Sequence, residues 1–193
     1  MSDVMIVMQK VAQALSGCGA AWYIDGSMAS SAHGTPRTTQ DVDFVAALES
    51  AHVEPFVSAL EADFYLDASA ICRAIASQRS FNVIHLATMY KADLFVLKDE
   101  PFAQEEMRRR QSVTLPTPDG ETSLWFCTAE DIVLQKLRWY QKGGGLSDQQ
   151  WRDIAGVLQA QDKLLDRTYL QHWAAELGLS ELLARAITEA GVS

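Results

Sequence analysis

The sequence has few cysteines and no long apolar run. Its cysteines, Cys18, Cys72 and Cys127, are odd in number and widely spaced, so neither a disulfide framework nor a clustered zinc site is indicated. No stretch approaches the roughly 20 consecutive apolar residues that a membrane-spanning helix needs. We therefore expect a soluble, cytoplasmic protein with reduced thiols and no membrane partner.

Positive charge is also scarce, because 16 Lys and Arg residues face 25 Asp and Glu residues and give a formal net charge of −9. This balance argues against bulk nucleic-acid binding, for which Lys and Arg must neutralise phosphates. The negative net charge does not exclude a local basic groove. A hydrophobic content of 48% with 21% charged residues is ordinary for a globular protein.

The 193 residues are enough for a compact core with a small helical appendage. We expect an α/β (α+β) catalytic core over residues 1–127, with a mixed central sheet, and a C-terminal helical bundle over residues 128–193. The expected strands are 20–25, 41–46, 64–66, 81–86, 89–97, 112–115 and 122–126. The expected helices are those ending near 16, following 27, and spanning 51–61, 101–110, 128–142, 147–161, 167–177 and 181–190.

Two aspartates that lie two residues apart are the first indication of a functional site. Asp41 and Asp43 occupy an expected strand, so both carboxylates should point to the same face, where they repel each other. Aspartate is depleted in strands, and such a conflict is expected where a ligand compensates for it. Mg²⁺, which binds one or two carboxylates together with substrate phosphates, fits best.

Further candidates lie on both sides of this pair. Gly26 and Ser27 follow an apolar strand and open a short helix, so they could offer backbone N–H groups and a hydroxyl to a triphosphate. Arg37 could also contact phosphate, although an exposed loop arginine is the commoner finding. If the strand that carries Asp93 neighbours residues 41–46, three carboxylates could hold two metal ions about 4 Å apart.

Gly26-Ser27, the acidic pair Asp41-Val42-Asp43 and the later Asp93 resemble the signature of the nucleotidyltransferase superfamily related to DNA polymerase beta. The resemblance covers about residues 22–96. It implies transfer of a nucleoside monophosphate from an NTP such as ATP to an acceptor, with Mg²⁺ as cofactor. It also implies that the Gly-Ser pair holds the triphosphate, that the acidic pair binds metal, and that Asp93 is a further metal ligand or the base.

A second stretch resembles the small stand-alone bacterial nucleotidyltransferases, which include the abortive-infection toxin family. It comprises residues 130–138 and, after a glycine-rich break, 151–154. This resemblance implies that Lys136 and Asp153 belong to the nucleotide-binding site and that a cognate antitoxin could be a partner. A solvated, salt-bridged helix face is the alternative explanation of these two residues.

The sequence leaves three classes of acceptor: a small molecule such as an antibiotic, a tRNA, or a protein. A toxin should arrest growth, whereas an antibiotic-modifying enzyme should confer resistance without arrest. The alternative from another class is a catalytically silent nucleotide-binding or interaction module that keeps the fold.

Overall fold

The chain divides into two compact units in the computed structural model, which describes residues 3–39, 41–117 and 120–192. Unit 1 comprises residues 1–25 and 39–126, and unit 2 comprises residues 26–38 and 127–193. The segment 26–38 therefore groups with the helical residues, although it falls inside the expected core 1–127. Pro118 and Asp119, which fall between the expected strands 112–115 and 122–126, lie outside the described residues.

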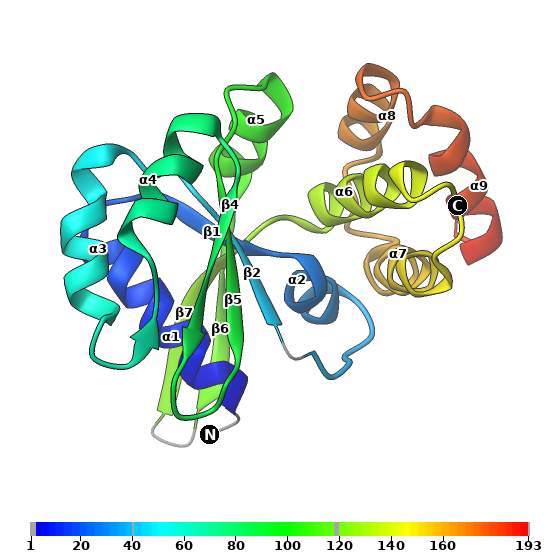
Figure 1. The fold of residues 1–193 in the computed structure, drawn as a ribbon. Helices are drawn as coiled ribbons and strands as arrows, with labels where there is room; N and C mark the ends of the chain where they lie inside the picture. Colours follow the sequence, from blue (N-terminus) through cyan, green and yellow to red (C-terminus); the bar gives the residue numbers. More distant parts are fainter. Residues whose placement is uncertain (1–2, 40, 118–119, 193) are drawn as a thin grey trace. The chain divides into compact units, whose positions relative to one another are not determined.

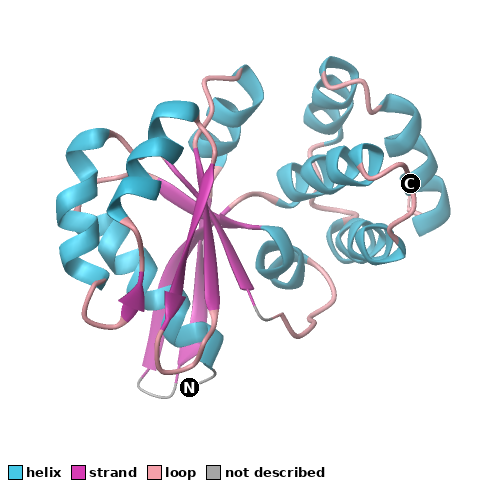
Figure 2. Ribbon diagram, in the orientation of Figure 1, coloured by secondary structure: helices cyan, strands magenta, loops and turns pink. Residues whose placement is uncertain are grey.

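Unit 1 is built on a mixed sheet, drawn in magenta in Figure 2. Its seven strands have the order β3-β4-β5-β2-β1-β7-β6. β2 pairs in parallel with β5, and β1 pairs in parallel with β7, while the other neighbours are antiparallel. The mixed sheet that the sequence predicted is confirmed. The strands are β1 (Trp22–Asp25), β2 (Asp41–Ala46), β3 (Phe64–Tyr65), β4 (Ser80–His85), β5 (Lys91–Val96), β6 (Gln111–Thr117) and β7 (Gly120–Phe126).

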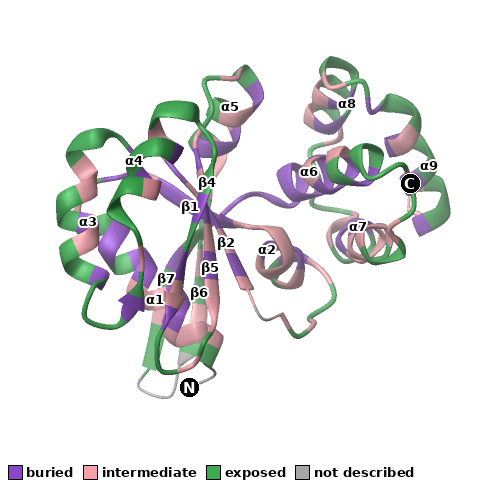
Figure 3. Ribbon diagram, in the orientation of Figure 1, coloured by how far each residue is buried: buried purple, intermediate pink, exposed green. Residues whose placement is uncertain are grey.

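Helices cover one face of this sheet. The helical segments of unit 1 are α1 (Asp3–Gly17), the 3-10 turn η1 (Ser50–His52), α3 (Val53–Leu60), α4 (Ala68–Ser77) and α5 (Pro101–Arg109). Figure 1 shows α1, α3 and α4 on the same side of the sheet. Residues on β2 and β5 alternate strictly between buried and partly exposed (Figure 3), and Phe44 and Leu94 belong to the buried set. The partly exposed set on the opposite face includes Asp41, Asp43 and Asp93.

The sequence did not predict α4, although its boundaries follow familiar rules. Asp67 caps the helix, because its carboxylate accepts a hydrogen bond from the Ser69 backbone N–H at 2.8 Å. Gln78 ends it in the left-handed conformation at φ +48°. Only Ile71 and Ala74 are buried along it, so the apolar pattern that would indicate a packed helix is short.

Unit 2 is helical. It contains α2 (Gly26–His33), α6 (Ala129–Lys142), α7 (Asp148–Gln161), α8 (Arg167–Glu176) and α9 (Ser180–Ala190). Thr128 caps α6, because Thr128 Oγ1 accepts from the Asp131 N–H at 3.2 Å and donates to Asp131 Oδ2 at 2.8 Å. Within the described part of the chain, no helix is long and apolar enough to cross a membrane.

Helix α2 packs against α6 and α7 and is tied to them by hydrogen bonds. His33 Nε2 donates to the carbonyl oxygen of Cys127 at 2.7 Å, and Gln161 Nε2 donates to the carbonyl oxygen of His33 at 2.8 Å. Gly34 lies so close to α7 that an added Cβ would be 2.8 Å from the backbone nitrogen of Val157. These contacts explain why segment 26–38 belongs to unit 2.

Candidate functional site

In unit 1 the parallel pairing of β2 and β5 brings the predicted carboxylates together. Asp43 lies directly opposite Asp93, and Asp41 lies directly opposite Lys91. Adjacent strands are about 4.8 Å apart, and paired residues point to the same face. The condition set for Asp93, that its strand neighbours residues 41–46, is therefore met.

The neighbouring strands extend this arrangement into a polar row. In the antiparallel pairing of β1 with β2, Asp25 lies opposite Asp43, and in the pairing of β4 with β5, Asn82 lies opposite Asp93. The row thus runs Asp25–Asp43–Asp93–Asn82 across four strands. We call it the carboxylate row after its three aspartates. Asp25 is not among the site residues that the sequence predicted, although an aspartate at the end of the apolar strand Trp22–Asp25 gives the same signal as Asp41 and Asp43.

A lysine lies beside this row. Lys91 Nζ is 2.6 Å from Asp93 Oδ2. The hydrogen bond to Asp93 is the largest cause that raises the pKa of Lys91, partly opposed by burial and reinforced by the negative charges of Asp93, Asp41 and Asp43. A hydroxyl also serves the acidic pair, because Thr39 Oγ1 donates to Asp41 Oδ1 at 2.9 Å.

The donor chemistry of this face suits a hard divalent cation. As placed, the described residues contain no group of three or more His, Cys, Asp or Glu side chains arranged to hold a metal ion by themselves. Mg²⁺ does not need such a cage, since it is usually held by one or two carboxylates, water and substrate phosphates. The carboxylates of Asp41 and Asp43 therefore fit Mg²⁺ that is shared with a nucleotide.

Unit 2 contains a second cluster of predicted residues. Lys136 Nζ is 2.8 Å from Asp153 Oδ2, and the two side chains are only 5% and 8% exposed. Gln150 Oε1 accepts from Lys136 Nζ at 3.2 Å, and Gln149 Nε2 donates to Asp153 Oδ1 at 2.9 Å. Because the pair is buried, a solvated surface salt bridge does not describe it.

Arg37 and Ser27 complete the cluster. Arg37 Nη2 donates to Ser27 Oγ and, at 3.3 Å, to Asp153 Oδ2. Arg37 Nε is buried and lies 3.3 Å from Asp153 Oδ1, but the geometry is too poor for a hydrogen bond. We call Ser27, Arg37, Lys136 and Asp153 the basic cluster, since two positive charges face one negative charge.

The electrostatics of the basic cluster favour an additional anion. Burial would raise the pKa of Asp153, but the hydrogen bond and charge of Lys136 and the charge of Arg37 hold this pKa below its usual value. Ser27 lies in the first turn of α2, where unpaired N–H groups attract negative charge. Gly26 has φ +62°, a conformation that favours glycine where β1 turns into α2.

His33, in contrast, has a structural role, because it is buried and links α2 to the start of α6. It is 7% exposed, and burial lowers its pKa despite the hydrogen bond to the Cys127 carbonyl and the charge of Glu130. Its ring is thus neutral and acts as a donor that links α2 to the start of α6.

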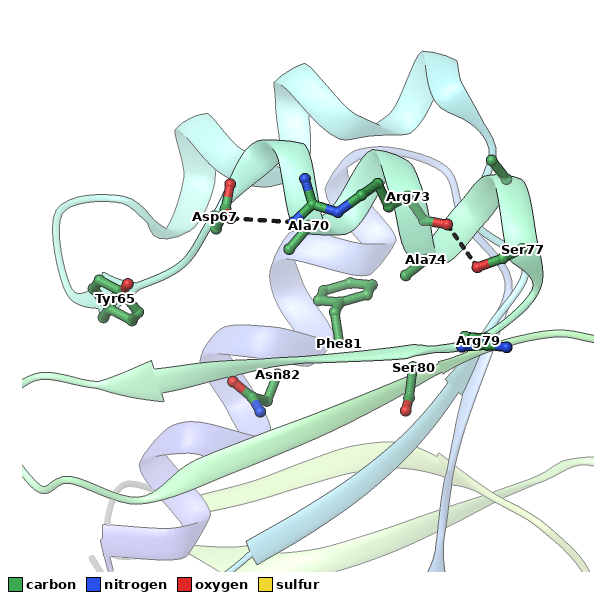
Figure 4. A pocket seen from close by; sticks show the side chains of 11 residues that line it. Tyr65, Asp67, Ala70, Arg73, Ala74, Ser77, Arg79, Ser80, Phe81 and Asn82 are labelled. Atoms are coloured by element: carbon green, nitrogen blue, oxygen red, sulfur yellow. Dashed lines mark hydrogen bonds and ion pairs between the residues drawn. The ribbon is translucent and has the colours of Figure 1, made fainter.

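A pocket of about 690 Å³ lies elsewhere in unit 1, between α4 and β4 (Figure 4). Tyr65, Arg73, Arg79 and Asn82 are among its lining residues. None of the site residues predicted from the sequence lines it, and Asn82 alone is shared with the carboxylate row.

Of the comparisons with known proteins, the one with solved structures bears on the architecture. No protein-family model matches the sequence, and a search of curated proteins finds no match to it. The chain is similar in structure to an antigenic nucleotidyltransferase-like protein from Paracoccidioides brasiliensis, with a TM-score of 0.55, 18% identity, and coverage of 96% of this chain and 92% of the other. It also aligns with the antibiotic-resistance factor ANT(2'')-Ia at a TM-score of 0.49 and 12% identity, covering 97% and 96% of the two chains. The topology and the first similarity show that this chain has the nucleotidyltransferase fold.

Proposed function

We propose that this protein is a magnesium-dependent nucleotidyltransferase that moves a nucleoside monophosphate from an NTP to a hydroxyl of an acceptor, with pyrophosphate as the leaving group. The observation that carries the proposal is the register of β2 and β5, which sets Asp43 opposite Asp93 on a partly exposed face, with Asp41 on the same face. Carboxylates gathered in this way repel one another unless a cation is present. The fold is consistent with this chemistry.

In this proposal, unit 1 holds the metal and handles the acceptor proton. Asp41 and Asp43 would hold Mg²⁺, which would neutralise phosphate charge during in-line transfer. Asp93 serves as a further ligand or as the base that accepts the proton of the acceptor hydroxyl. Thr39 keeps the Asp41 carboxylate oriented through its hydrogen bond of 2.9 Å.

Unit 2 supplies groups for the triphosphate. Arg37 and Lys136 attract phosphate oxygens, and Ser27 and the first N–H groups of α2 donate hydrogen bonds to them. Asp153 holds both cations in place, since it contacts Arg37 at 3.3 Å and Lys136 at 2.8 Å. Its role is to position these residues.

Labelling with α-³²P-NTPs, Mg²⁺ and cell extract tests the reaction. The wild-type protein should transfer label to an acceptor, and the variant Asp41→Asn/Asp43→Asn should not. Asp99→Asn is the matched control, because Asp99 is an exposed carboxylate outside the carboxylate row. Labelling that persists in the double variant at the wild-type rate would show the mechanism to be wrong.

The acceptor classes can be separated in the same system. Mass spectrometry of the labelled product distinguishes a small molecule, a tRNA and a protein, and the net charge of −9 makes a large RNA the least favoured. Growth arrest on expression, relieved by a cognate antitoxin, would support the toxin proposal, whereas drug resistance without arrest would support antibiotic modification. Tight, metal-independent nucleotide binding without transfer to any acceptor would instead favour the catalytically silent module.

A further inference from the structure

We propose that Lys91 is a tethered cation that pairs with the carboxylate row when no divalent ion is bound and competes with that ion for Asp93. The inference rests on the proposed function in one respect, since it takes the metal to bind at Asp41, Asp43 and Asp93. It assigns a role to a residue outside the predicted metal ligands.

The position of Lys91 carries the argument. It lies on β5 opposite Asp41 and two residues before Asp93, so it shares a face with all three carboxylates. Its Nζ is 2.6 Å from Asp93 Oδ2, which is a charge-assisted hydrogen bond. A carboxylate oxygen that accepts this bond has given up part of its capacity to bind a metal ion.

The ammonium group of Lys91 can also move away from Asp93. Its side chain is 40% exposed, compared with 21% for Asp93, and a flexible four-carbon stem lets the ammonium turn towards water. A divalent ion places more charge among the carboxylates than an ammonium group does, but it must displace or tolerate the lysine. Lys91 therefore weakens binding of a free ion, while the negative charge of an NTP offsets this effect when metal and nucleotide arrive together.

Binding of Mn²⁺ to the nucleotide-free protein, followed by electron paramagnetic resonance, tests this inference without a turnover assay. Lys91→Met should bind Mn²⁺ roughly tenfold more tightly than the wild type. A factor of this order is expected when a unit positive charge about 5 Å from a divalent ion is removed in a water-like dielectric. Lys91→Arg, which keeps the charge, should stay near the wild-type Kd, and Asp93→Asn should bind more weakly.

Lys98→Met is the matched control. It changes the net charge of the chain equally, but Lys98 lies beyond the end of β5 and pairs with Glu100 at 3.4 Å. Its Kd for Mn²⁺ should stay within about twofold of the wild-type value, and thermal melts of all variants report whether they fold.

The outcomes separate the inference from the proposed function. If the wild type binds Mn²⁺ and Asp93→Asn weakens binding, but Lys91→Met does not tighten it, then the lysine does not compete and the inference alone fails. Equal tightening by Lys98→Met would also overturn it, since overall charge would then explain the effect. If neither the wild type nor Lys91→Met binds Mn²⁺ at millimolar concentrations, the inference fails, whereas the metal-dependent function fails only if Mn²⁺ also does not bind when a non-hydrolysable NTP analogue is present.

Discussion

The buried pair of Lys136 and Asp153 gives an asymmetric prediction, because Asp153 is shared and Lys136 is not. Asp153 contacts Lys136 at 2.8 Å and Arg37 at 3.3 Å. Asp153→Ala therefore leaves two positive charges facing each other, one of them on a side chain that is 5% exposed. Lys136→Met leaves Asp153 with Arg37 and Gln149 as partners and fills the space of the lysine stem.

The magnitudes follow from the burial of the pair. Removing one partner of a buried ion pair costs about 3–5 kcal/mol of unfolding free energy, and Asp153→Ala should fall in this range. Lys136→Met should cost less, roughly 1–2 kcal/mol, since the remaining carboxylate keeps a positive and a polar partner. The double variant Lys136→Met/Asp153→Ala should cost less than the sum of the single variants.

The contribution of Asp153 to the free energy of unfolding should decrease as the pH falls. The pKa of Asp153 is lowered in the folded protein, so its contribution is fully present above the unfolded value of about 3.9. It is lost as pH falls through the lower folded pKa, because the native carboxylate is then protonated. The stability difference between the wild type and Asp153→Ala should therefore narrow below about pH 4.

Urea unfolding monitored by tryptophan fluorescence measures these differences, and the chain has five tryptophans. Asp148→Ala is the control on the same helix, since Asp148 is exposed in the first turn of α7 and should cost less than about 1 kcal/mol. The reasoning is refuted if Asp153→Ala is as mild as Asp148→Ala, or if Lys136→Met proves the more damaging single change.

Two further predictions concern the packing of α2 against its neighbours. Gly34→Ala should destabilise the protein by about 1–3 kcal/mol, because its Cβ would be 2.8 Å from Val157 N and 3.0 Å from Ser30 O, whereas Gly17→Ala, with nothing within 4 Å, should be nearly neutral in the same urea experiment. The stability of the wild type should also fall from pH 7 to pH 5, because burial lowers the pKa of His33 and the unfolded chain takes up a proton near pH 6.5 that the folded protein resists. His33→Gln, which keeps an N–H donor for the Cys127 carbonyl but does not titrate, should show a flatter pH dependence, and an unchanged slope would contradict the assignment.

The sequence predicted the elements that carry the carboxylates, because local periodicity is enough for that. Asp41 and Asp43 two residues apart defined a face of β2, and the strand with Asp93 was recognised from its apolar and β-branched neighbours. Which residues lie opposite each other depends on strand register, which is set by pairing between distant segments. The position of Asp25 opposite Asp43 and that of Lys91 opposite Asp41 depend on that register.

The helical half shows the same division. The cap at Thr128 and the helix after it were predictable from local chemistry, as confirmed by the bond from the Asp131 N–H at 3.2 Å. That Arg37, 116 residues before Asp153, would bond to it could not be read from either segment. Long-range packing also explains α4, whose short buried stripe of Ile71 and Ala74 is too weak a pattern to stand out.

The membership of segment 26–38 in unit 2 restricts how such a protein can be cut or recombined. The chain passes from one unit to the other after Asp25, after Thr38 and after Phe126, so neither unit corresponds to one continuous stretch of gene. A chain truncated after residue 127 would retain α2 but lose α6 and α7, leaving Arg37 without Asp153 and His33 without Gln161. Deletions and domain exchanges should therefore succeed only when segment 26–38 is kept together with the C-terminal helices.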